Sequence, residues 1–151
     1  MDLNQLKHQI LQIIETPDTS RDQKLTLLCQ FLHNEVDYYD WVGFYFAVHP
    51  SRQLQLGPFA GEPTDHTIIP FGKGICGQVA VSGKNFVVPD VQAQDNYIAC
   101  SIHVKSEIVV PLYVQDINIG QLDIDSHTLN AFTEKDEQFL EWVNQQVAQL
   151  F

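Results

Sequence analysis

Two cysteines and three carboxylates have the types and the spacing that chemistry requires. Cys100 lies seven residues before Glu107, which opens an apolar segment, and Cys76 follows a glycine-rich turn. Asp123 and Asp125 alternate with apolar residues in a later segment, about 7 Å apart along a strand. A thiol acts as a nucleophile in its thiolate form, whereas clustered carboxylates suit the binding of an ammonium group or the transfer of a proton. The five residues therefore predict a thiol-dependent site with an acidic binding surface.

The three carboxylates also allow two further interpretations, which the residues alone leave open. Glu107, Asp123 and Asp125 could end their strands in solvent, where charged side chains are ordinary. A metal site is a second alternative, since Asp123, Asp125 and His127 recur at period two, and a cysteine or His66 could complete a ligand set. The candidate ligands lack the paired spacing of a zinc motif, so we expect neither a metal nor another cofactor.

The composition is that of one globular domain without nucleic-acid or membrane partners. The chain of 151 residues is 44% hydrophobic and 18% charged, and we expect a single domain over residues 1–151. Eight Lys and Arg against 19 Asp and Glu give a net charge of -11, which repels phosphate backbones and anionic lipid surfaces. No apolar run approaches the roughly 20 residues of a membrane span, and the amino terminus lacks a signal-peptide pattern. With three cysteines, too few for a secreted disulfide framework, we expect a cytoplasmic protein.

Helical periodicity marks both ends of the chain. Apolar residues recur at helical spacing over residues 2–15 and again over residues 20–34, a segment that opens with a serine suited to an N-cap. Cys29 lies on the apolar stripe of the second segment, and we expect it to be an ordinary buried side chain. A further helix begins after Thr133, which has Asp136 three residues later in a near capping box.

The middle of the chain has the alternation of a sheet. Trp41 and Tyr45 point to one face of a strand, roughly 13 Å apart with Gly43 between them, and we expect open space above this glycine. Core packing is one interpretation of the two aromatic residues, and a pocket with aromatic walls is the other. A short helix is expected near residues 76–81, and residues 115–117 should join two strands as a hairpin. The predicted strands are 41–48, 54–59, 66–70, 86–88, 107–114 and 118–125. Together with the terminal helices, they predict an α+β domain with a mainly antiparallel sheet.

Several motifs taken together resemble one known family. They are Trp41-Val-Gly-Phe-Tyr45, Pro70-Phe-Gly-Lys-Gly-Ile-Cys-Gly77, Ile98-Ala-Cys100, Ser106-Glu-Ile-Val-Val-Pro-Leu112, Gly120-Gln-Leu-Asp-Ile-Asp-Ser126 and Phe132-Thr133. The combination is similar to that of the free methionine-R-sulfoxide reductases, which are single GAF domains. The resemblance implies a GAF fold and the reduction of free methionine sulfoxide.

The resemblance also implies roles for the site residues. Cys100 matches the family's catalytic cysteine, which attacks the sulfoxide sulfur and is left as a sulfenic acid. Trp41 and Tyr45 match aromatic residues that enclose the sulfoxide and methyl end of the substrate. The family's carboxylates hold the amino group and supply a proton or a hydrogen bond to the sulfoxide oxygen, and they correspond to Glu107, Asp123 and Asp125.

The chain departs from the family at the step that restores Cys100. The family commonly has three cysteines, of which two match Cys76 and Cys100, and the third position holds His66 here. We expect Cys76 to form a disulfide with Cys100, which thioredoxin then reduces. The resemblance further implies a homodimer. The alternative function is that of a GAF module that binds or senses a small ligand without turnover.

Overall fold

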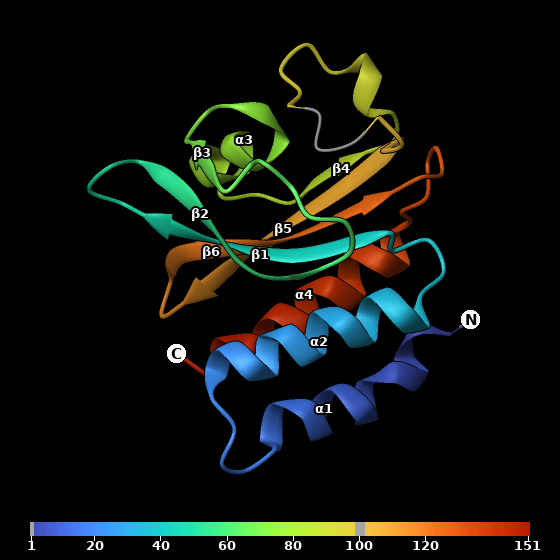
Figure 1. Cartoon of the computed structure of the whole chain (residues 1–151), viewed down its shortest axis with the longest axis vertical. Helices are drawn as coiled ribbons and strands as arrows, with labels where there is room; N and C mark the ends of the chain where they lie inside the picture. Colours follow the sequence, from blue (N-terminus) through green and yellow to red (C-terminus); the bar gives the residue numbers. More distant parts are fainter. Residues whose placement is uncertain (1, 99–101) are drawn as a thin grey trace.

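The fold is an α+β arrangement built on one six-stranded sheet. The computed structural model describes residues 2–98 and 102–151. The helices are α1 (Lys7–Glu15), α2 (Arg21–Glu35), α3 (Gly74–Ser82) and α4 (Glu134–Ala148), with short 3₁₀ turns at Leu3–Leu6 and Val91–Ala93. The strands are β1 (Trp41–Val48), β2 (Gln53–Ala60), β3 (Ile68–Pro70), β4 (Phe86–Val88), β5 (Ser106–Val114) and β6 (Ile117–Ser126). Neighbouring strands are antiparallel in the order β3-β2-β1-β6-β5-β4, which confirms the predicted fold class (Figure 1).

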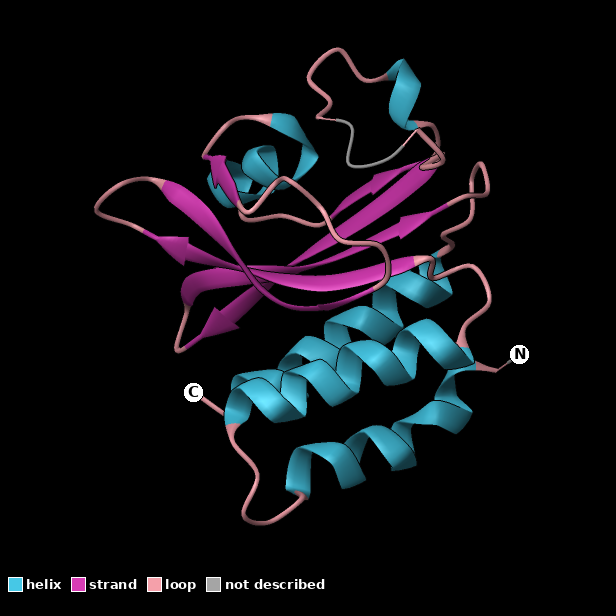
Figure 2. Cartoon of the chain, viewed as in Figure 1, coloured by secondary structure: helices cyan, strands magenta, loops and turns pink. Residues whose placement is uncertain are grey.

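The two faces of the sheet carry different layers. Helices α2 and α4 pack against one face, and α1 packs on their outer side (Figure 1). Apolar side chains from these helices and from the strands form the larger core. The opposite face carries α3 and the loops around it, as the colouring by secondary structure in Figure 2 makes clear. A smaller apolar cluster fills this second layer.

Capping interactions determine where the helices begin and end. Ser20 Oγ accepts a hydrogen bond from the backbone N–H of Gln23 at 3.2 Å, and the Gln23 side chain accepts one from the Ser20 N–H, so the predicted N-cap is confirmed. At α4, the backbone N–H of Thr133 donates to Asp136 Oδ2 at 2.9 Å. Helix α3 ends at Gly83, which adopts the left-handed conformation with φ 68°.

The hairpin of β5 and β6 has a tighter turn than predicted. Ile117 already pairs with Val114, so Gln115 and Asp116 alone make the connection. Their φ angles of 51° and 65° are those of a type I′ turn, whose twist matches that of the flanking strands. The predicted hairpin is therefore confirmed, whereas the predicted three-residue loop is wrong.

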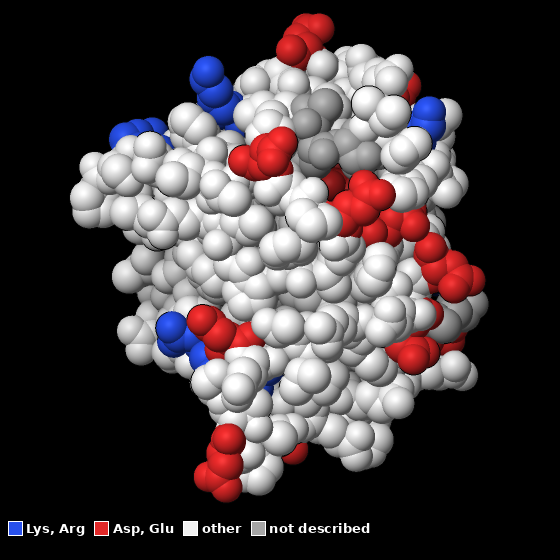
Figure 3. All heavy atoms as spheres, in the orientation of Figure 1, with Lys and Arg blue, Asp and Glu red and all other residues white. Residues whose placement is uncertain are grey.

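Among the charged side chains of the surface, acidic ones outnumber basic ones. Aspartates and glutamates are scattered over the face drawn in Figure 3, which shows few lysines and arginines, in keeping with the net charge of -11. In the described part of the chain, every helix is too short or too polar to cross a bilayer.

Candidate active site

Strand pairing brings the predicted site residues together on the face that carries α3. Strand β6 lies between β1 and β5, so Asp125 is paired with Trp41 on one side and with Glu107 on the other. Asp123, two residues earlier on the same face, is paired with Gly43 of β1. The three carboxylates are between 2% and 4% exposed. The alternative in which they end their strands in solvent is therefore wrong.

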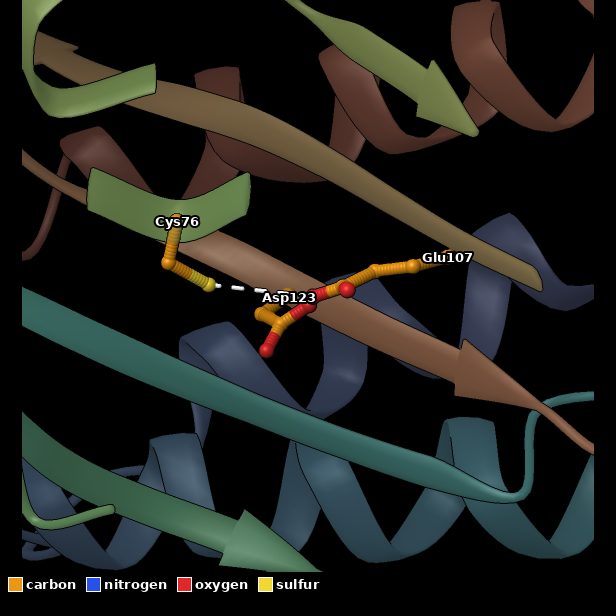
Figure 4. A group of neighbouring side chains, drawn as sticks. All are labelled: Cys76, Glu107 and Asp123. Carbon is orange, nitrogen blue, oxygen red and sulfur yellow. Dashed lines mark hydrogen bonds between the residues drawn. The ribbon is translucent and has the colours of Figure 1, made fainter. Parts of the chain in front are cut away.

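Helix α3 places the Cys76 thiol beside these buried carboxylates, which we call the acidic patch. Cys76 Sγ lies 3.8 Å from Glu107 Oε2, to which it donates a hydrogen bond. Ligand atoms of Cys76, Glu107 and Asp123 all lie within 4.8 Å of one another, and Figure 4 shows the three side chains converging from α3, β5 and β6. Gln121 of β6 fixes the first turn of the helix, because its Nε2 donates to the Cys76 carbonyl oxygen at 3.1 Å.

Burial controls the protonation of these groups. Desolvation raises the pKa of the Cys76 thiol well above its ordinary value, and the negative charges of Asp123, Glu107 and Asp125 raise it further. Desolvation also raises the pKa of Asp123, although side-chain hydrogen bonds with Glu107 and Cys76 act in the opposite direction. The pKa of Asp125 is raised well above its ordinary value by desolvation and then by the charge of Asp123. The patch therefore favours bound protons or a bound cation over three free charges.

Two carboxylate oxygens lack the partners that burial normally demands. Oδ1 of Asp123 and Oδ1 of Asp125 are fully buried, and neither accepts a hydrogen bond from the residues that the structure describes. A buried acceptor without a donor costs about 1–3 kcal/mol, and more when the group is charged. The explanations for such groups in native proteins include a catalytic role and a bound water molecule or ion.

Trp41 and Tyr45 form an aromatic wall, but in a different arrangement from the predicted one. Their ring centroids lie 6.3 Å apart, because the Trp41 indole folds over Gly43 and stacks on Phe59 at 5.6 Å. A Cβ at Gly43 would overlap this indole. The open space expected above Gly43 is therefore filled, and the glycine is needed for the close approach of the ring.

The acidic patch borders two small cavities. One of about 10 Å³ is lined by Tyr45, Cys76 and Asp123, and another of about 30 Å³ is lined by Trp41 and Asp125. The first has roughly the room that one water molecule needs. Both are far below the approximately 300 Å³ of a small pocket for an organic ligand. A substrate of amino-acid size must therefore displace part of the wall.

Cys100, the predicted nucleophile, lies outside the described residues. The loop before it is tied to α3 by Asn96, whose Oδ1 accepts a hydrogen bond from the Gly74 N–H at 2.9 Å and whose Nδ2 donates to the Gly72 carbonyl oxygen at 2.7 Å. Ile98 lines the smaller cavity together with Cys76. Sequence reasoning missed Asn96, because an asparagine in a polar loop does not reveal its partner.

The two histidines of the metal alternative border the site but are not part of its group of close ligand atoms. His66 lines the cavity of Cys76 and Asp123, and His127 lines the cavity of Asp125. His127 Nδ1 is 3.9 Å from Asp40 Oδ1, and its side chain is 48% exposed. His66 precedes β3 instead of lying within it, and its carbonyl oxygen accepts a hydrogen bond from Tyr45 Oη at 2.9 Å. Among the described residues, the potential ligands that come together are Cys76, Glu107 and Asp123.

The fold and the buried site define the class of the protein. A GAF domain model matches residues 18–151, which include the whole sheet and α2 to α4, so the chain belongs to the GAF-domain family. Within that family it groups with proteins named free methionine-R-sulfoxide reductase. The predicted family resemblance is thereby confirmed.

Three relatives illustrate the similarity. Protein YtsP of Bacillus subtilis is 38% identical over 90% of this chain and 83% of its own. The free methionine-R-sulfoxide reductase of Escherichia coli is 40% identical over 79% of this chain and 68% of its own. The fRMsr of Staphylococcus aureus, solved in its reduced form, superimposes with a TM-score of 0.90 at 35% identity, over 99% of this chain and 94% of its own. The same protein has been solved in complex with substrate.

Proposed function

We propose that this protein reduces free L-methionine-(R)-S-oxide to methionine. The observation that carries the proposal is the pair of buried, unpartnered carboxylate oxygens on Asp123 and Asp125, beside the Cys76 thiol and the aromatic wall. A free amino acid brings an ammonium group and a sulfoxide, which supply the cation and the reducible centre that such a site suits. The named relatives support the same reaction.

The carboxylates divide the work of binding and proton supply. Asp125 lines one cavity together with Trp41, and burial raises its pKa, which favours the protonated form. In the proposal it donates a hydrogen bond or a proton to the sulfoxide oxygen. Asp123 lines the cavity of Tyr45 and accepts a hydrogen bond from the ammonium group. Glu107, in contact with the Cys76 thiol, serves both binding and proton transfer.

The reaction balances with two thiols of this chain. In the proposal the Cys100 sulfur attacks the substrate sulfur, methionine leaves, and Cys100 becomes a sulfenic acid. Cys76 then attacks the Cys100 sulfur, its proton passes to Glu107, and the sulfoxide oxygen leaves as water. The two thiols thus provide two electrons and two protons, and one disulfide remains. Thioredoxin reduces that disulfide in the proposed cycle.

The proposed setting and assembly follow the same reasoning. Among the described residues Cys29 and Cys76 are unpaired thiols, as the reducing cytoplasm would keep them, and we propose that location. We also propose a homodimer. The domain includes residues 1–151 in this proposal, because Ile10 and Ile14 of α1 pack in the same core as α2 and α4.

Consumption of free methionine-R-sulfoxide with dithiothreitol tests the proposal. Turnover that Cys100→Ser abolishes and Cys29→Ala preserves would support it, since Cys29 lies in the helix-covered core. Tight binding without turnover in the unaltered protein would instead favour a sensing module. Mass spectrometry after one turnover without reductant should find a Cys76–Cys100 disulfide, and its absence would refute the proposed resolving step.

Specificity for the free amino acid gives a second test. If Asp123 holds the ammonium group, methionine sulfoxide inside a peptide has no such group to offer and should be a poor substrate. Comparable values of kcat/KM for the free amino acid and for an acetylated, amidated derivative would contradict the role of Asp123.

A further inference from the structure

The thiol and carboxylate group has the donor set of a metal site. Cys76 offers a sulfur atom, and Glu107 and Asp123 each offer an oxygen atom, all within 4.8 Å of one another. The three side chains come from α3, β5 and β6, each held by regular secondary structure (Figure 4). All three are at most 5% exposed. A mixed sulfur and oxygen set on rigid elements suits a borderline-soft divalent ion better than Mg²⁺ or Ca²⁺, which prefer oxygen alone.

The separation of the sulfur from one carboxylate oxygen is close to the separation that Zn²⁺ requires. Around a tetrahedral Zn²⁺, with Zn–S about 2.3 Å and Zn–O about 2.0–2.2 Å, ligand atoms lie roughly 3.3–3.7 Å apart. The distance from Cys76 Sγ to Glu107 Oε2 is 3.8 Å. The cavity of about 10 Å³ that Cys76 and Asp123 line has room for a bare ion. The other ligand atoms lie at most 4.8 Å from one another, so side-chain rotations that close these separations by about 1 Å would complete the coordination.

An independent observation indicates that a cation belongs at this site. Asp123 Oδ1 is buried and has no hydrogen-bond partner among the described residues, and the same is true of Asp125 Oδ1 on the same strand. Hydrogen bonds within the group leave these two oxygens unused. A divalent cation would neutralise the charge and occupy an unused lone pair at once.

We propose that Cys76, Glu107 and Asp123 bind Zn²⁺, and that the ion occupies the place of the substrate ammonium group and so inhibits the enzyme. On binding, the Cys76 thiol loses its proton to the buffer and becomes a thiolate ligand. Three protein ligands leave a fourth position to water. The competition with substrate rests on the proposed function, whereas the metal site does not.

Binding is measured in a Cys100→Ser background, which prevents turnover and removes a competing thiol. Isothermal titration with Zn²⁺ alone, on protein freed of reductant under nitrogen, should give one site per chain. Adding Cys76→Ser or Asp123→Asn should weaken that site at least about tenfold, the effect that even an outer-shell partner of a metal ligand has. Cys29→Ala is the matched control, because it removes the other buried thiol from the opposite face and should leave the affinity unchanged. Equal affinity in all four proteins would overturn the site.

Two further measurements keep the proposal falsifiable. Titration with Cd²⁺ should produce a thiolate-to-metal absorption band that Cys76→Ser removes, and a band that survives would show that another residue binds the ion. Near-ultraviolet circular dichroism should show that each variant is folded before its affinity is compared.

Displacement of the ion separates this proposal from the proposed function. Free methionine-R-sulfoxide added to the Zn²⁺-loaded Cys100→Ser protein should release the ion, whereas a peptide-bound sulfoxide should not. Release supports both the site and the competition. Zn²⁺ binding that Cys76→Ser abolishes but that methionine sulfoxide does not affect would confirm the metal site and refute its overlap with the ammonium position.

Discussion

Buried carboxylates on the two faces of the sheet differ in how completely they are hydrogen-bonded. On the helix-covered face, Asp136 is 1% exposed, and its Oδ1 accepts hydrogen bonds from Tyr38 Oη at 2.7 Å and Tyr39 Oη at 2.8 Å. Its Oδ2 accepts the Thr133 N–H at the start of α4. On the α3 face, Asp123 and Asp125 are equally buried, yet each leaves one oxygen without a partner among the described residues. A carboxylate whose hydrogen bonds are all made stabilises the fold, whereas one with an unpartnered oxygen costs free energy that a bound donor or cation would recover.

The two described cysteines show the same contrast. Cys29 is fully buried in the core of the helix-covered face, where desolvation alone raises the pKa of its thiol. Cys76 is buried on the other face, and three carboxylates add to the effect of desolvation on its pKa. Burial makes the first thiol an inert side chain. The Cys76 thiol, in contrast, has a proton acceptor beside it, Glu107. In the proposed metal site this thiol exchanges its proton for a cation.

The largest effect should come from exchanging one carboxylate on each face for its amide. Glu107→Gln removes the proton acceptor of Cys76 in the resolving step and also a carboxylate of the binding site, so we expect both kcat and kcat/KM to fall about 100-fold or more, the scale of general acid–base catalysis. The unfolding free energy should change by less than about 1 kcal/mol, because the amide oxygen still accepts the thiol hydrogen bond. Steady-state kinetics and urea unfolding measure the two quantities.

Asp136→Asn is the matched variant on the helix-covered face. We expect it to lower the unfolding free energy by about 2 kcal/mol, since it turns an acceptor of the Thr133 N–H into a donor at the N-cap of α4. Its kcat/KM should stay within about twofold of the unaltered protein. If the two variants had the same profile, the contrast between the faces would not hold.

The pH dependence of stability should reveal the buried carboxylates on the face that carries α3. The folded-state pKa values of Asp123 and Asp125 are raised above the ordinary value of 3.8, so between that value and the raised ones the folded protein binds more protons than the unfolded chain. Their contribution to the unfolding free energy is therefore fully present below pH 3.8 and is lost as pH rises through the folded-state pKa values. Each group changes the slope by at most about 1.4 kcal/mol per pH unit.

Removal of both carboxylates should reduce this loss of unfolding free energy with rising pH. The difference between the unfolding free energy of Asp123→Asn/Asp125→Asn and that of the unaltered protein should therefore change in favour of the variant's stability as pH rises from about 4 to about 7. Cys29→Ala is the control, because its raised thiol pKa keeps it neutral throughout this range. Parallel curves for the double variant and the unaltered protein would show that these carboxylates do not titrate with raised pKa values.

Local sequence patterns predicted the elements of this fold well. The segment of β1 is rich in aromatic and β-branched residues, and the start of α2 has a serine N-cap, so both elements could be predicted from a few neighbouring residues. The hairpin of β5 and β6 was predictable because its strands are adjacent in sequence. The spacing of Asp123 and Asp125 is likewise sufficient to put both side chains on one face, because side chains alternate along a strand.

Contacts between distant segments account for what the sequence did not reveal. The pairing of Trp41 with Asp125 joins β1 and β6, the first and last strands in the sequence, and no local pattern specifies it. The placement of Cys76 over Glu107 depends on how α3 packs against β5 and β6. The fold of the indole over Gly43 is a choice of side-chain rotamer, which spacing along a strand does not determine. The roles of these residues came from the family resemblance instead.

The smallest predicted effect compares two glycines that each face an aromatic ring. Gly43→Ala would place a methyl group against the Trp41 indole, and Gly57→Ala would place one against the Phe46 ring, which packs on the helix-side core. We expect each change to lower the unfolding free energy by about 1–3 kcal/mol through overpacking. Because Trp41 lines the cavity of Asp125, Gly43→Ala alone should also weaken substrate binding. A loss of about 1 kcal/mol in binding corresponds to a roughly fivefold rise in KM. An equal rise in KM for Gly57→Ala would mean that the sheet transmits strain between its faces, and that the site is not confined to the face that carries α3.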